Sequence, residues 1–128
     1  MKPQPLIAVN DVESSSRWYQ AVLGLSSGHG GKDYEQLLFR GRMVLQLHRW
    51  DAHAHPHIGR PELNPHGNGV LLWFQTAHFD RALQRITRHG ATVLEGPEVN
   101  ANAHHREIWL QDPDGYVVAL AGAYGDLG

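Results

Sequence analysis

The chain contains an internal repeat, which restricts its fold more than any other feature of the sequence. A short apolar run, PLIAV, precedes VESSSRWYQAVLGL, and a second, GVLLWFQ, precedes AHFDRALQRITRHG. Matching positions in the two longer segments differ by a constant 67 residues: Val12, Ser16 and Tyr19 against Phe79, Leu83 and Ile86. Their spacing is that of one stripe along a helix. Each half is therefore predicted to begin with a strand followed by an amphipathic helix.

The ends of both predicted helices carry recognisable signals. Asn10 or Asp11 can cap the first helix, because a short polar side chain accepts hydrogen bonds from free backbone amides there. Gly24 and Gly90 follow the last periodic residues of the two helices. Glycine at that point commonly ends a helix by adopting a left-handed conformation.

The second part of each half is predicted to form a hairpin. Residues 34–39 and 43–47 flank RGR, while residues 106–110 and 116–120 flank QDPDG. In DPDG, Pro113 favours the second turn position and Gly115 can take the positive φ that follows a type I turn. Each half is thus expected to be a strand, a helix, and two or three further strands.

These elements predict an α+β fold made of two similar modules that share one core, since neither half could bury its sheet face alone. The first module covers about residues 4–50, a linker rich in histidine and proline covers 51–67, and the second module covers about 68–122. An unrelated α+β sandwich is the alternative.

Composition narrows the class of protein. The 128 residues suit one domain, and a net charge of −2 favours neither nucleic acid nor a membrane surface as partner. There is no cysteine, so disulfides and cysteine-based metal sites are excluded. MKPQPLIAVN does not resemble a signal peptide, and no apolar run approaches the length of a membrane span. A cytoplasmic protein is expected.

Three segments resemble the vicinal oxygen chelate superfamily, which groups glyoxalases, bleomycin resistance proteins and extradiol dioxygenases. They are VNDVESSSRWYQAVLGL, GATVLEGP and IWLQDPDGYVVALAG, and the resemblance extends over nearly the whole chain. It implies two βαβββ modules whose sheets curl round a shared cup, often completed in a homodimer. It does not imply one function, because this scaffold hosts metal-dependent lyases, isomerases and dioxygenases as well as metal-free binding proteins.

The resemblance also implies where a metal would be bound, on the first and last strand of each module. The corresponding residues are Gln4, Gln46, Leu71 and Ala119. Leucine and alanine have no donor atom, and the glutamine carbonyls are weak, uncharged ligands for a divalent cation. No metal at the family positions, and no other cofactor, is therefore predicted.

The segment HRWDAHAHPHIGRPELNPHG, residues 48–67, holds five of the ten histidines. His53, His55 and His57 would lie about 6.6 Å apart on an extended strand, too far for one ion without a turn. The surrounding prolines and glycines favour a loop. Solvent-exposed linker histidines are the favoured interpretation; the alternatives are a linker that folds over the cup and touches ligand, or adventitious nickel or zinc binding.

Alternation along the predicted strands indicates which side chains line the cup. Leu45, Leu47, Ile108 and Leu110 suit the helix-covered face, which leaves aromatic and polar residues for the other. The predicted ligand-binding residues are Gln46, Trp50, Trp73, Gln75, Trp109 and Ala119. Trp73 and Trp109 could instead fill a core or a dimer interface.

Two residues are candidates for proton transfer, Glu107 and His48. Burial of Glu107 beside tryptophan is expected to raise its pKa and suit it to act as a general base. The alternative is that Glu107 pairs with an arginine such as Arg106 or Arg40. His48 lies on a strand rather than in the linker, and its alternative is a structural, hydrogen-bonded role.

Three functions are consistent with these residues. The preferred one is a glyoxalase/bleomycin resistance-like protein that binds a small, partly apolar molecule without a metal at the family site. The alternatives are a metal-dependent lyase, isomerase or dioxygenase that uses His48 or linker histidines, and a metal-free enzyme in which Glu107 or His48 transfers a proton. Ser14 to Ser16 lack triad partners, and GHGG lacks the context of a phosphate loop.

Overall fold

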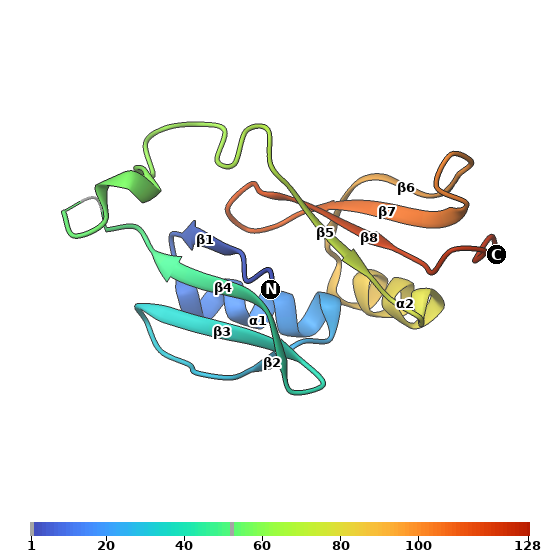
Figure 1. Ribbon diagram of the computed structural model, residues 1–128, viewed down its shortest axis with the longest axis horizontal. Coiled ribbons are helices and arrows are strands. Elements are labelled where there is room, and N and C mark those ends of the chain that lie inside the picture. Colours follow the sequence, from blue (N-terminus) through green and yellow to red (C-terminus); the bar gives the residue numbers. More distant parts are fainter. Residues whose placement is uncertain (1, 52) are drawn as a thin grey trace. The chain divides into compact units, whose positions relative to one another are not determined.

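The computed structural model describes residues 2–51 and 53–128 (Figure 1). The chain divides into two compact units, Met1–His66 and Gly67–Gly128. In the described residues, each unit contains one α-helix and one four-stranded mixed sheet. The predicted α+β architecture of two βαβββ modules is confirmed.

The first unit contains β1 (Leu6–Val9), α1 (Val12–Leu23), β2 (Ser26–Ser27), β3 (Tyr34–Phe39) and β4 (Arg42–Arg49). Its strand order is β1-β4-β3-β2, with β1 parallel to β4 and the other pairs antiparallel. Beyond β4 the connecting segment forms a short 3₁₀ helix, Pro56–Ile58.

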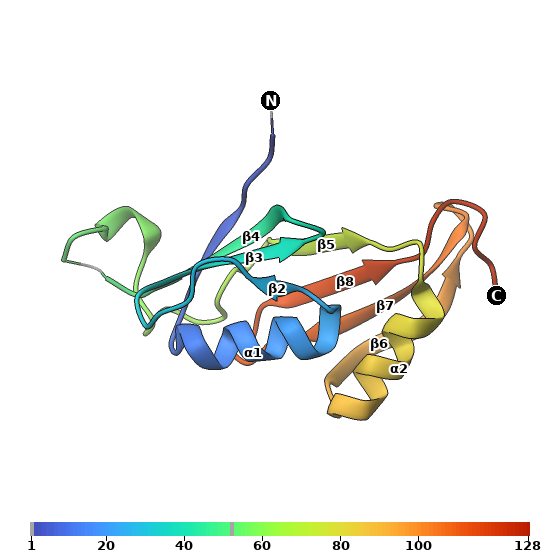
Figure 2. The same cartoon turned by 90° about the horizontal axis from the view of Figure 1, so that it is seen from below.

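Helix α1 begins and ends as its sequence indicates. The Asp11 side chain accepts a 2.9 Å hydrogen bond from the Ser14 amide, and Gly24 ends the helix with φ 71°. Figure 2 shows α1 running along one face of its sheet. That face carries Leu37, Leu45 and Leu47, which are fully buried. Removal of these apolar side chains from water stabilises the first unit.

The second unit contains β5 (Leu71–Gln75), α2 (Phe79–His89), β6 (Thr92–Asn100), β7 (His105–Gln111) and β8 (Val117–Ala121). Its strand order, β5-β8-β7-β6, reproduces that of the first unit, and β5 is again parallel to β8. Gly90 ends α2 with φ 74°. The repeat seen in the sequence is therefore a repeat of topology.

The even-numbered side chains of β7 lie on the sheet face toward α2, as two contacts of Arg106 indicate. The Arg106 guanidinium lies 4.8 Å from the centre of the Phe79 ring and forms a 2.9 Å ion pair with Asp80, both on α2. Ile108 and Leu110 continue the same face and are buried. The odd-numbered side chains of β7 consequently lie on the sheet face opposite α2.

Both hairpin turns follow their sequence signals. The Asp112 side chain accepts 2.9 Å hydrogen bonds from the Asp114 and Tyr116 amides, and Gly115 has φ 92°. In the other hairpin, Arg40 and Gly41 both have positive φ, 49° and 78°. Two successive residues of positive φ give a two-residue connection the twist that adjacent strands require.

Of the helices that the structure describes, none has the length and apolar character needed to cross a membrane.

Candidate functional site

Two tryptophans flank a row of small residues on the face of the second sheet opposite α2. Ala119 on β8 is in register with Trp73 on β5 and with Trp109 on β7. Ala119 has no exposed surface, whereas Trp73 is 44% exposed. The next row places Ala121 between Gln75 and Glu107. Small side chains on β8 thus leave the two indoles and Gln75 as the accessible part of this face, whereas Glu107 is buried.

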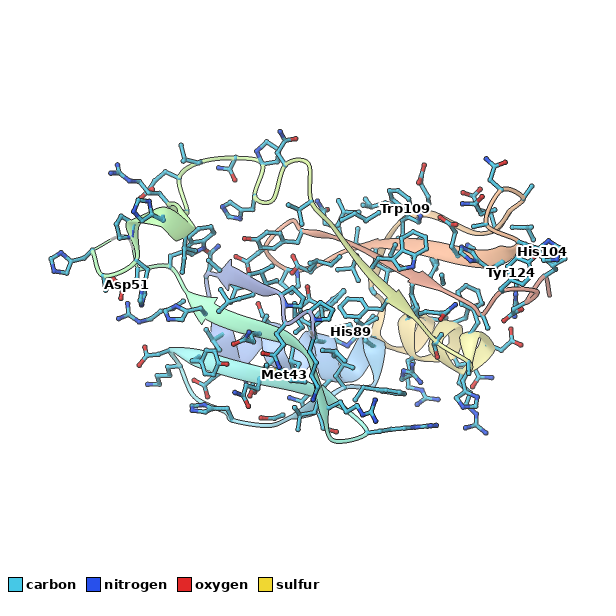
Figure 3. All side chains as sticks on the ribbon, viewed as in Figure 1. Met43, Asp51, His89, His104, Trp109 and Tyr124 are labelled. Carbon is cyan, nitrogen blue, oxygen red and sulfur yellow. The ribbon has the colours of Figure 1, made fainter. Side chains whose placement is uncertain are left out.

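The Glu107 carboxylate is buried at the centre of a hydrogen-bond network. The Trp109 Nε1–H donates to Oε2 at 2.6 Å, and Asn100 Nδ2 donates to Oε1 at 2.7 Å. His105 Nε2 lies 3.1 Å from the same Oε1 atom. These contacts fix the orientation of the Trp109 ring and connect the end of β6 to the start of β7. Figure 3 labels Trp109 on β7.

The expected rise in the pKa of Glu107 is wrong. Burial is the largest influence and does raise the pKa, but the hydrogen bonds from Trp109, Asn100 and His105 outweigh it and lower the pKa below its ordinary value. Glu107 is therefore held as a carboxylate, which accepts hydrogen bonds and cannot donate one.

The alternative role for Glu107, pairing with Arg106, is also wrong. Arg106 is on the other face of β7 and forms ion pairs with Asp80 and Asp126, each at 2.9 Å. Arg40 lies in the hairpin turn of the first unit, with its guanidinium 5.3 Å from the centre of the Phe39 ring. The partners of Glu107 are neutral donors and an imidazole.

Sequence reasoning missed His105 because the strand was expected to begin one residue later, at Arg106. In the structure β7 begins at His105, which pairs with Asn100 on β6. The signal that could have identified it is the alternation of His105, Glu107 and Trp109 at i, i+2 and i+4, which places all three on one face. The His105 ring also lies 5.8 Å from the Trp73 ring.

The equivalent face of the first sheet carries a network of neutral polar groups. The Tyr34 hydroxyl donates a 2.5 Å hydrogen bond to Gln46 Oε1, and Gln46 Nε2 donates to the Gln4 carbonyl at 2.9 Å. Gln36 Nε2 donates to the Tyr34 hydroxyl at 3.1 Å. Gln46 therefore lies on the predicted face, with its amide committed to partners in its own unit.

His48 and Trp50 make ring contacts with histidines of the connecting segment. His48 lies 5.1 Å from the His55 ring, edge to face, and its Nδ1 is 2.7 Å from the Arg49 carbonyl. Trp50 lies 5.2 Å from His66. Among the described residues, Trp50 Nε1 is the one buried side-chain nitrogen or oxygen without a hydrogen-bond partner. The linker thus packs partly against the end of β4, while His53, His55 and His57 stay exposed.

The residues at the family metal positions do not suit a divalent cation. Gln46 Oε1 already accepts a hydrogen bond from Tyr34, and the Gln4 side chain would add only an uncharged amide oxygen. Leu71 and Ala119 offer no donor atom. Within residues 2–51 and 53–128, no group of three or more histidine or acidic side chains is arranged to hold a metal ion. The donor atoms at these four positions are therefore too few and too weak to hold a catalytic cation.

Comparison with known proteins agrees with this architecture. The sequence profile of the Glyoxalase/Bleomycin resistance protein/Dioxygenase superfamily matches residues 3–120. The chain belongs to this superfamily. It is 25% identical over 118 residues to "Virulence protein STM3117" of Salmonella typhimurium, covering 91% of this chain and 79% of that protein.

Solved structures of other proteins have the same fold as this chain. A glyoxalase/bleomycin resistance protein/dioxygenase family enzyme from Burkholderia phytofirmans has a TM-score of 0.74 at 18% identity, covering 93% of this chain and 95% of that one. The crystal structure of the Salmonella virulence protein has a TM-score of 0.67 at 21% identity, covering 95% of each chain. At such identities the likeness concerns the fold, so the function of this superfamily member has to be argued from its own residues.

Proposed function

We propose that this protein binds a small, partly apolar molecule on the β5–β8–β7 face of its second unit, without a metal at the family positions. The observation that supports this most strongly is the half-exposed Trp73 on the same face as Trp109, whose ring is held by Glu107. Tryptophan combines a large apolar surface with a polar N–H and contributes strongly where a ring can stack.

The face is organised before any ligand arrives. A 2.6 Å hydrogen bond from Nε1 to a carboxylate restricts the Trp109 ring. Binding then loses less side-chain entropy than it would with a mobile indole. Ala119 lies in register between Trp73 and Trp109 and has no exposed surface. We therefore assign ligand contact chiefly to the two indole rings, and the small Ala119 side chain forms the floor between them.

We propose that further residues of both units contribute to ligand binding or proton transfer. Gln75 is exposed two residues beyond Trp73 on β5 and would supply a hydrogen bond to a polar ligand group. In the first unit, Gln46 and Trp50 are proposed contacts as well, and His48 is a candidate for proton transfer. The Trp50 Nε1–H is a buried donor without a partner among the described residues, so an acceptor group that reached it would satisfy it.

A titration with methoxynaphthalene, a flat and partly apolar probe, tests the proposal. Quenching of tryptophan fluorescence would report binding to the wild type and to Trp73→Ala and Trp109→Ala. We expect each substitution to weaken binding about tenfold, because loss of one aromatic contact and its buried area is worth roughly 1 kcal/mol or more. Tyr124→Ala, which removes an aromatic ring 79% exposed in the same unit, is the control and should bind as wild type. Undiminished affinity in both tryptophan variants would contradict the proposal.

We also propose that the protein is a homodimer acting in the cytoplasm. The superfamily resemblance supports dimerisation, and β1 and β5 are each the outermost strand of their sheet, a position at which strands of two copies can pair. Light scattering after size-exclusion chromatography should give twice the 14.3 kDa chain mass. A monomer mass at micromolar concentration, or recovery from another cell fraction, would contradict these two points.

A further inference from the structure

Glu107 and His105 form a carboxylate–imidazole pair on the face opposite α2. Oε1 of Glu107 and Nε2 of His105 are 3.1 Å apart, and the side chains are 6% and 10% exposed. An ionised carboxylate only accepts hydrogen bonds, so the hydrogen between these two atoms belongs to His105 Nε2. In neutral imidazole only one nitrogen carries hydrogen. Glu107 therefore selects the tautomer in which Nδ1 bears the lone pair.

The Nδ1 atom of His105 is available to a ligand. No residue in the described part of the chain forms a hydrogen bond with it, although Nε2 is engaged. Among the described residues, Trp50 Nε1 is the one side-chain nitrogen or oxygen that is both buried and unpartnered. The unpartnered His105 Nδ1 is therefore not fully buried. An acceptor with a fixed tautomer thus retains contact with solvent at the edge of a mostly buried ring.

The position of His105 relates it to the tryptophan face. Its ring lies 5.8 Å from the Trp73 ring, with an angle of 47° between the planes. Ala119 and Ala121, on the strand between them, add no large side chain to this face. An aromatic molecule lying against Trp73 would carry its substituents next to His105.

We propose that His105 is the proton acceptor of this face, and that the ligand class is an aromatic molecule bearing a weakly acidic hydroxyl group. The location of the ligand rests on the proposed function, whereas the tautomer of His105 does not. On binding, the hydroxyl donates to Nδ1. If the proton transfers, the O–H bond breaks, its electron pair stays on oxygen, and a new N–H bond forms at Nδ1.

Glu107 then stabilises the positive charge that appears on the imidazole. The imidazolium keeps its Nε2–H bond to the carboxylate, so the transferred proton produces a paired charge rather than an isolated one. Asn100 and Trp109 donate hydrogen bonds to other lone pairs of the Glu107 carboxylate and so fix its orientation. The proton returns to the oxygen when the ligand leaves, so no further reactant is required.

The tautomer is tested without any ligand. Nuclear magnetic resonance of ring nitrogens, recorded above the ordinary histidine titration range, distinguishes a protonated from an unprotonated nitrogen. We expect His105 in the wild type to carry hydrogen on Nε2 alone. In Glu107→Gln that exclusive preference should be lost, because the amide can present either its oxygen or its NH₂ group to Nε2. Hydrogen on Nδ1 in the wild type would overturn the proposal.

The ligand class is tested with naphthol and methoxynaphthalene, which differ in the hydroxyl hydrogen. We expect the wild type to bind naphthol about tenfold more tightly and to increase its naphtholate emission, as an adjacent proton acceptor would. His105→Phe keeps a ring beside Trp73 but has no acceptor, so it should bind the two probes equally. His105→Gln, a second variant, should give no increase in naphtholate emission. His104→Asn, at the exposed neighbouring residue, is the control.

The outcomes separate this inference from the proposed function. If both probes bind wild type equally, or if His105→Phe retains the preference for naphthol, the assignment of His105 is wrong while binding at the tryptophans stands. If neither probe binds, the proposed function and this ligand class both fail. A merely structural His105 would change stability when substituted but would leave the ratio of the two affinities at its wild-type value.

Discussion

Ser16 Oγ on α1 donates a 2.7 Å hydrogen bond to Glu35 Oε2 on β3. The same carboxylate accepts from Ser27 Oγ at 2.8 Å and from the backbone amides of His29 and Gly30 at 3.1 and 2.7 Å. Glu35 thereby joins the helix, its sheet and the GHGG segment in the core of the first unit. That glycine-rich segment binds a carboxylate of its own chain through its amides.

Glu35→Gln is expected to destabilise the first unit by about 2 kcal/mol at neutral pH, because the amide cannot satisfy all these donors. Burial is the largest influence on the pKa of Glu35 and raises it, but the hydrogen bonds together lower it. A pKa lowered by folding gives stability that is present above the ordinary carboxyl pKa and is lost as pH falls through the folded value. Urea unfolding across the acidic range should show a shallower loss in the variant.

Glu62→Gln, in the exposed connecting segment, is the matched control for that measurement. It should unfold at the wild-type urea concentration at each pH. If Glu35→Gln behaves in the same way, the carboxylate does not have the structural role assigned to it.

Gly67 is expected to tolerate no side chain. It has φ 67°, and a Cβ atom there would lie 2.5 Å from Tyr116 Cδ1. Gly67→Ala combines backbone strain with a clash against a buried ring, so we expect a loss of about 2–3 kcal/mol in the free energy of unfolding. Gly69→Ala is the control, since its φ is 84° but its Cβ would meet open space; only the backbone cost of about 1 kcal/mol is expected. Equal losses in the two variants would contradict the packing described for Tyr116.

The Tyr116 hydroxyl should ionise only in strong alkali. Burial, followed by the negative charges of Asp112 and Asp114, raises its pKa to about 12. A raised pKa on folding gives stability that is present below the ordinary tyrosine value of about 10 and is lost as pH rises through the folded value. Ultraviolet titration should contain one late tyrosine transition that is missing from Tyr116→Phe. Identical titration curves would disprove the assignment.

Arg40 occupies a backbone conformation that suits another residue better. Its φ is 49° in the two-residue turn between β3 and β4. Asparagine adopts positive φ at lower cost, so Arg40→Asn should raise stability by roughly 0.5–1 kcal/mol after loss of the contact with Phe39. Arg42→Asn, within β4, should not increase stability. A decrease in melting temperature for Arg40→Asn would show that the contact with Phe39 outweighs the strain.

Local signals in the sequence were enough to predict both α-helices, the two hairpins and the faces of their strands, but not β2 or β6. The helix caps and the turn depend on residues only a few positions away in the chain, as at Asp11, Gly24, Gly90 and Gly115. The alternation of side chains along a strand likewise assigns Trp73 and Trp109 to one face, without knowledge of which strands are adjacent. The repeat then predicts that both halves share a topology.

The chemistry of Glu107 depended on residues that local patterns do not connect. Asn100 lies seven positions away, across the β6–β7 turn, and pairs with His105 in register. That pairing determines where β7 begins, and so whether His105 belongs to the face. The sign of the pKa shift follows from counting donors around the carboxylate, which requires the folded structure.

The most direct test of the central claim uses the indole N–H resonances of the four tryptophans, assigned by single Trp→Phe variants. On addition of methoxynaphthalene, the account predicts that the signals of Trp73 and Trp109 shift together and saturate at one dissociation constant, while that of the buried Trp18 stays in place. Saturable shifts elsewhere in the spectrum with Trp73 and Trp109 unmoved would contradict it.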